Sequence, residues 1–181
     1  MAASSVFGKI LESATKFDSN TSAGTTTTLH KNFMNGIADY LDQHVTFNGT
    51  FSGTNGTSSM TSPVTCKVDA SLLRPLVLSG ANGWSSWVQQ FYLAIRTAPV
   101  IKPASFIPAG TIPVFPSISL GWSQSQLKNT AGNNGREAHG KCMDMIGAKI
   151  IQDMKKGYIK SIPGAMGAYV GALTVSSIIC D

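Results

Sequence analysis

Two stretches with helical periodicity each lead directly into a segment that is almost free of charge and interrupted by glycine. The first helix is predicted over residues 28–45 and precedes Thr46-Phe-Asn-Gly-Thr-Phe-Ser-Gly-Thr-Asn-Gly-Thr57. The second is predicted over residues 137–156 and precedes Ser161-Ile-Pro-Gly-Ala-Met-Gly-Ala-Tyr-Val-Gly-Ala-Leu-Thr-Val175. Extended segments without charge need a sheet, a neighbouring subunit or a membrane to cover them. The chain is therefore predicted to contain two helix-and-extension units, which could pack side by side in one domain.

The first extension alternates between two faces, as a β-strand does. One face carries Val45, Phe47, Gly49, Phe51 and Gly53, and the other carries Thr46, Asn48, Thr50, Ser52 and Thr54. Asn55-Gly56 predicts a tight hairpin turn, and residues 63–68 are the candidate returning strand.

Two further helices are predicted from apolar residues at helical spacing. Residues 4–17 form a short amphipathic helix, which is marginal alone and needs a partner. Residues 18–28 are rich in Ser, Thr, Asn and Gly, so this first helix is a candidate arm that reaches a neighbour. Residues 84–95 form the most aromatic helix, which ends before Pro99.

Five prolines between residues 99 and 116 exclude a helix or a central strand there. The apolar residues between them indicate an extended strap laid across a surface. The predicted fold class is α+β, with amphipathic helices packed on a small antiparallel sheet. Residues 1–27 form the N-terminal helical arm and linker. Residues 28–181 form one domain, which includes the strap 99–118 and the uncharged C-terminal segment 161–181.

The composition favours a subunit of a larger assembly. The chain of 181 residues is 43% hydrophobic, enough for a core, but only 13% charged, against about 25% in ordinary soluble domains. A surface so poor in charge is expected to be largely taken up by contacts with other molecules. The net charge of +5 includes no Lys/Arg stripe, so specific nucleic-acid binding is not predicted.

No constellation for catalysis or metal binding stands out. The three cysteines and three histidines lack the spacing of a zinc site, and no nucleophile elbow or phosphate loop occurs. We therefore predict neither cofactor nor metal, and a protein that is not an enzyme. An enzyme site formed between subunits around Arg136, Glu137 and His139 is the least favoured alternative.

The expected interface anchors are large apolar side chains, since these dominate such contacts. They are Trp84, Trp87, Phe91 and Tyr92 on the aromatic helix, with Phe106, Ile112, Val114 and Phe115 on the strap.

The helix followed by Val45-Thr-Phe-Asn-Gly-Thr-Phe-Ser-Gly53, and the later Pro163-Gly-Ala-Met-Gly-Ala-Tyr-Val-Gly171, resemble small virion structural proteins of tailed bacteriophages. The resemblance implies a tail, baseplate or neck component located in the virion and assembled in the host cytoplasm. Its partners would be copies of itself and other virion proteins, joined by arm exchange and strand addition.

An alternative function depends on the second extension. Residues 161–180 carry no charge and are long enough to span a membrane, although Pro163 and three glycines weaken that interpretation. The alternative is therefore a membrane-associated or membrane-inserting protein that uses this segment.

Overall fold

The computed structural model describes residues 2–15, 26–76, 84–119 and 135–181, with backbone only for residues 26–29, 84–88 and 135–138. Its four described helices are α1 (Ala3–Thr15), α2 (Thr26–His44), α3 (Trp84–Thr97) and α5 (Gly135–Gly157). Its strands are β1 (Val45–Asn55), β2 (Ser58–Asp69), β3 (Val100–Ile101), β4 (Ile107–Pro108), β5 (Ser161–Met166) and β6 (Tyr169–Cys180). A short 3-10 helix, η1 (Ser71–Leu73), follows β2. The predicted α+β class is confirmed.

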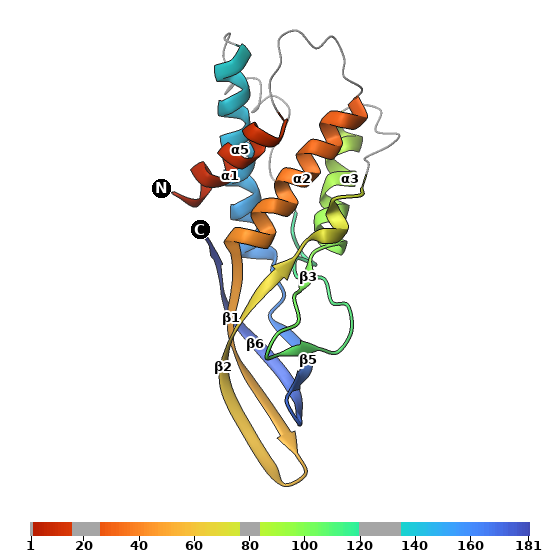
Figure 1. Ribbon diagram of the computed structural model, residues 1–181, viewed down its shortest axis with the longest axis vertical. Coiled ribbons are helices and arrows are strands. Elements are labelled where there is room, and N and C mark those ends of the chain that lie inside the picture. The colour runs from red at the N-terminus through yellow and green to blue at the C-terminus, as the bar shows by residue number, and fades with distance from the viewer. Residues whose placement is uncertain (1, 16–25, 77–83, 120–134) are drawn as a thin grey trace.

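The strands form one antiparallel sheet that curls into a nearly closed, barrel-like shape, in the order β3-β2-β1-β6-β5-β4. Strand β1 lies near its centre and pairs with β2 on one side and β6 on the other, with a register shift at Asn48/Gly49 on the β6 side. The helices gather at one end of this sheet, and the hairpin of β1 and β2 projects from the other (Figure 1). The expectation of helices laid across the face of a sheet is therefore corrected: the helices cap one end.

The two predicted helix-and-extension units lie side by side. Helix α2 leads into the hairpin of β1 and β2, and α5 leads into the hairpin of β5 and β6. The two hairpins are neighbours in the sheet, because β1 of the first hairpin pairs with β6 of the second. Both hairpins turn on a glycine at φ +60°, Gly56 in the first and Gly167 in the second, a backbone conformation that side chains disfavour.

The strap fills the inside of the curled sheet. Its Phe115 ring lies 5.8 Å from the ring of Phe47, and its Phe106 ring lies 5.8 Å from that of Phe51. These side chains are buried, and each buried phenylalanine is worth about 1.5–3 kcal/mol. The strap contains the short strands β3 and β4 and packs inside its own chain, against the inner face of the sheet.

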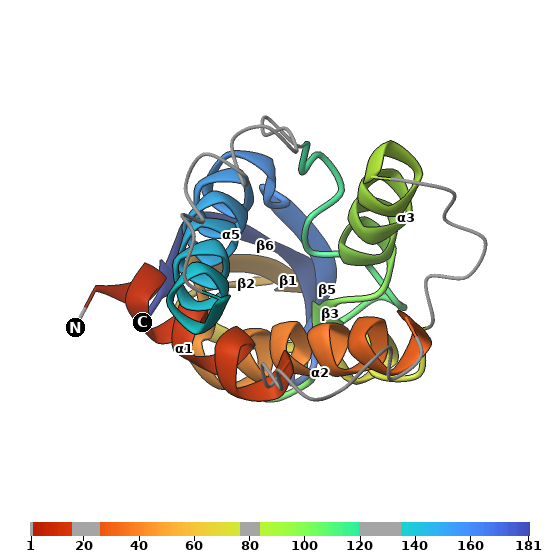
Figure 2. The same ribbon diagram turned by 90° about the horizontal axis from the view of Figure 1, so that it is seen from above.

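The N-terminal helix is also packed within the chain. Helix α1 lies against α2 and α5 (Figure 2), and its Phe7 and Leu11 are fully buried. The expected arm, extended toward a neighbouring molecule, is therefore not what the structure shows. The apolar stripe of α1 is covered by α2 and α5 of its own chain. Residues 16–25 are a long enough connection for α1 to pack against them.

Residues 161–180 form the strands β5 and β6, and β6 pairs with β1 along its length. Among the residues that the structure describes, no helix is both long and apolar enough to cross a membrane.

Candidate functional site

The outer face of the sheet is uncharged over residues 46–66 and 161–180, and its charges lie at the helical end of β2, where Lys67 is exposed and Asp69 is half-buried. Residues 46–66 and 161–180 contain no ionisable acid or base apart from cysteine and tyrosine. Every second residue of β1 faces the core, so the other residues turn hydroxyl and amide groups outward. The exposed hydroxyl side chains of this face are Thr50, Ser52, Thr54, Ser59, Thr61, Thr65, Ser161, Thr174, Ser176 and Ser177. A partner could bury the uncharged part of this face without stranding a charge.

A shallow hollow of about 370 Å³ lies near the end of the sheet farthest from the helices. We call its lining the tip surface: Ser52, Gly53, Thr54, Ser59, Met60, Thr61, Val170 and Gly171. Gly53 and Gly171 are paired across β1 and β6, and a Cβ on Gly171 would lie within 2.5 Å of the Gly53 Cα. Val170 is 69% exposed beside them. The tip surface thus combines an open apolar side chain with neutral hydroxyl groups.

Both outer long strands carry a proline where the backbone faces away from the sheet. Asn55 and Ser58 flank a two-residue turn and form a hydrogen-bonded pair, so Ser59, Thr61, Pro63 and Thr65 point their backbone groups away from β1. By the same count Pro163 of β5 points its backbone away from β6, and its carbonyl accepts a hydrogen bond from the Ala109 N–H at 2.8 Å. Proline has no N–H to offer an added strand. Pro63 therefore opposes strand addition along β2, whereas the same side of β5 is already covered by β4.

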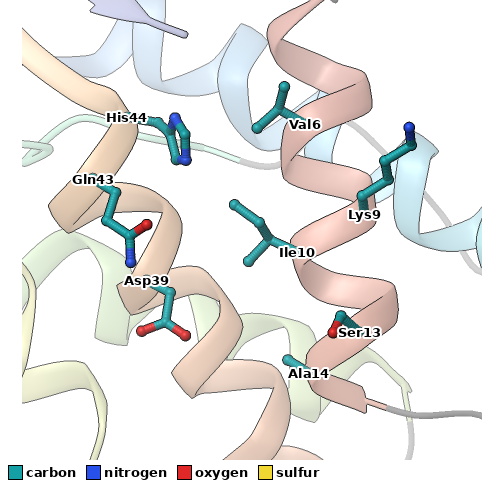
Figure 3. A pocket seen from close by; sticks show the side chains of 8 residues that line it. All are labelled: Val6, Lys9, Ile10, Ser13, Ala14, Asp39, Gln43 and His44. Atoms are coloured by element: carbon teal, nitrogen blue, oxygen red, sulfur yellow. The ribbon is translucent and has the colours of Figure 1, made fainter.

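A second hollow, of about 510 Å³, lies between α1 and α2 (Figure 3). Its lining residues are Val6, Lys9, Ile10, Ser13, Ala14, Asp39, Gln43 and His44. The Asp39 carboxylate is already engaged by Arg74 at 2.6 Å, and Arg74 also binds Asp42 at 2.8 Å. The His44 ring stacks near Tyr40, with ring centroids 5.3 Å apart. In this lining Asp39 is paired with Arg74 and His44 packs on Tyr40, so neither is placed as a base beside a nucleophile.

Five of the eight predicted interface anchors are core residues of this chain. Phe91, Tyr92, Phe106, Val114 and Phe115 are buried, so they are not available to a partner. Their aromatic and aliphatic surface is consumed by the curled sheet and by the packing of α3. These positions were predicted as packing or interface anchors, and the structure shows that they pack within the chain.

The remaining three anchors have different outcomes. Ile112 is half-buried at the edge of the core. Trp84 and Trp87 belong to α3, but their side chains lie outside the described residues. The residues that sequence reasoning missed are those of the tip surface, whose signal was the absence of charge in both hairpins.

Tyr92 and His139 are buried or half-buried ionisable side chains with hydrogen-bond partners, whereas the buried Tyr40 hydroxyl has none among the described residues. Tyr92 donates a hydrogen bond to Asp153 at 3.1 Å, and burial raises the pKa of both groups. The Thr15 hydroxyl lies 2.7 Å from His139 Nε2, and burial lowers the pKa of that histidine. The side chains of Arg136 and Glu137, named with His139 as an alternative enzyme site, lie outside the described residues.

The cysteines are poor candidates for chemistry. All three are reduced. Burial raises the pKa of the Cys66 and Cys142 thiols. Burial is also the main cause that raises the pKa of Cys180 to about 11. They are therefore thiols rather than reactive thiolates at neutral pH. Within the described ranges, no three His, Cys, Asp or Glu side chains are placed to hold a metal ion.

The described residues thus define an α+β protein with helices at one end of a nearly closed sheet and a neutral tip surface at the other. Comparisons with protein-family models, with curated proteins and with solved structures found no match to this chain. Its function is therefore inferred from its own surface and core.

Proposed function

We propose that this protein is a non-enzymatic structural subunit of a larger assembly, and that it contacts its neighbours through the tip surface. The observation that carries the proposal is the charge-free part of the outer face, made by residues 46–66 and 161–180, which includes exposed Val170. Interface centres are depleted in charged residues, because an unpaired charge is costly to bury. A neutral surface of hydroxyl and small apolar groups avoids that cost.

The proposed assembly is the virion of a tailed bacteriophage, in its tail, baseplate or neck. This part of the proposal is supported by the resemblance of the two helix-and-extension segments and by the low charged fraction of 13%. The neighbours are copies of the same chain and other virion proteins. The contacts use side chains at the tip surface, since Pro63 opposes strand addition along β2 and β4 already covers β5.

The proposal is tested by placing a charge in the tip surface. Val170→Lys puts an ammonium group at the centre of the contact, and we expect the dissociation constant of the assembly to rise by a factor of about 30 or more, equivalent to a hot-spot loss of about 2 kcal/mol. Sedimentation velocity over a range of concentrations measures this change, and circular dichroism confirms that the variant folds.

The matched control is Leu93→Lys on α3, an equally drastic change at a side chain that is 59% exposed and belongs to the helical end of the molecule (Figure 1). We expect it to leave assembly unchanged within about threefold, as surface changes usually do. A wild-type chain that stays monomeric at high concentration, alone and with other proteins of the particle, would refute the proposal. So would equal effects of the two lysine variants.

A further inference from the structure

Helix α1 occupies a fitted socket on its own chain. The Phe7 ring stacks on the Tyr40 ring of α2, with centroids 3.9 Å apart and planes within 4°. Phe7 and Leu11 are fully buried, and Thr15 at the end of the helix bonds to His139 of α5. We call the surface of α2 and α5 that receives α1 the α1 socket.

The α1 socket is shaped for this helix by close contacts at three glycines. A Cβ on Gly8 would lie 2.7 Å from the Asp144 Cα, and one on Gly147 would lie 3.1 Å from the Phe7 Cβ. A Cβ on Gly36 would lie 3.0 Å from the Ala14 Cβ. A helix with a larger residue in place of Gly8 would collide with the backbone of α5. The occupant that fits the α1 socket is therefore α1 itself, from this chain or from an identical one.

The connection between α1 and α2 is longer than its closed position requires. Ala14 contacts Gly36, and Gly36 lies ten residues into the helix that begins at Thr26, or about 15 Å along its axis. Residues 16–25 can reach about 33 Å when extended. The connection can therefore span about twice the distance that the closed position of α1 requires.

We propose that neighbouring copies in the assembly exchange α1, so that Phe7 of one copy completes the α1 socket of the next. This inference rests on the proposed function, because exchange needs copies held close together. Every contact of the closed chain is kept in the exchanged form, so exchange requires no new complementary surface. The partner of the α1 socket is thus a second copy of this chain, and the segment that joins the copies is residues 3–15.

The test uses two full-length single variants that can form a disulfide only across the α1 socket. Ala14→Cys places a thiol on α1, and Gly36→Cys places one on α2, at a Cβ separation of 3.0 Å, which is about 0.5–0.8 Å shorter than a relaxed disulfide prefers. The two variants are co-expressed, oxidised, and separated on a non-reducing gel. In random exchange, about half of the α1 helices of one variant enter a socket of the other, so we expect about half of the chains in a disulfide-linked dimer.

Two controls accompany this mixture. The native cysteines are present in every sample, so co-expression of Ala14→Cys with Leu93→Cys measures their background, and we expect only traces of dimer there. The double variant Ala14→Cys/Gly36→Cys, studied at high dilution, shows that the bond closes within one chain. A mixed pair with no more dimer than the Leu93→Cys control, together with internal closure in the double variant, would overturn exchange.

The outcomes separate this inference from the proposed function. A protein that assembles in sedimentation velocity but gives no mixed dimer lacks α1 exchange and retains its role as a subunit. A protein that is monomeric under all conditions and closes the bond only internally loses both.

Discussion

Asp153 is placed so that its protonation contributes to stability. Its carboxylate lies between α3 and α5 and accepts a hydrogen bond from Tyr92. Burial raises its pKa above the ordinary value of 3.8, although the Tyr92 hydrogen bond and the charges of Lys149 and Lys156 partly oppose this shift. The folded state therefore binds more protons than the unfolded state from about pH 4 up to the folded pKa. Over that interval, this residue's contribution to stability falls as the pH rises.

We predict that Asp153→Asn removes this pH dependence. The amide oxygen still accepts the Tyr92 hydrogen bond but carries no charge, so the stability of the variant relative to wild type should increase between about pH 4 and pH 7. Urea unfolding at each pH measures the difference. Asp153→Ala is the control, and loss of the hydrogen bond should cost about 0.5–1.5 kcal/mol. A constant difference between Asp153→Asn and wild type across this range would contradict the prediction.

At the scale of elements, the two hairpins are alike in their turns and in their edges. Each turns on a glycine with positive φ, and each outer strand carries one proline whose backbone faces outward. A sheet edge with free N–H and C=O groups invites pairing with another chain. Pro63 removes one donor from the middle of the β2 edge, and β4 covers β5 at Pro163, so both hairpins are protected from an added strand.

We predict that Pro63→Val restores an open edge on β2. The variant should self-associate several-fold faster than wild type, because an N–H group replaces the blocked position. Static light scattering after concentration follows the growth. Pro75→Val, at an exposed proline beyond η1 and outside the sheet, is the matched control and should behave as wild type. Equal scattering from both variants would show that Pro63 does not protect the edge.

The sequence predicted local elements better than their arrangement. Periodicity located the α2 and α3 helices within a few residues, and alternation in residues 45–54 placed Phe47 and Phe51 on one face, which the structure shows to be the buried one. The pairing of β1 with β6 and the curl of the sheet could not be predicted, because they join residues more than a hundred positions apart. The same large separation in sequence explains why Phe106 and Phe115 were expected to be interface anchors. They are buried only because the sheet closes around them.

At the scale of the whole molecule, charge is unevenly distributed. The helical end carries most of the ionised groups, including the Arg74 contacts to Asp39 and Asp42, whereas the hairpins from residue 46 to 66 and from 161 to 180 carry none. The exposed apolar side chains Ile107 and Val170 both belong to the sheet. Association through the tip surface therefore depends on apolar and hydroxyl contacts, which salt screens little.

We predict that the dissociation constant of the assembly changes by less than about threefold between about 0.05 and 0.5 M sodium chloride. Sedimentation equilibrium at several salt concentrations measures it, with circular dichroism to confirm that the fold is unchanged. An interface held by ion pairs would instead weaken by tenfold or more over the same range. Such weakening would place the contact at the charged helical end.

The central position of β6 has a consequence for synthesis on the ribosome. Strand β1 is complete at Asn55, but its partner begins only at Tyr169. At about 5–20 residues per second, that interval lasts roughly 6–23 s. During this time the edge of β1 that later pairs with β6 has no native partner. Its N–H and C=O groups on that side are open to pairing with other chains.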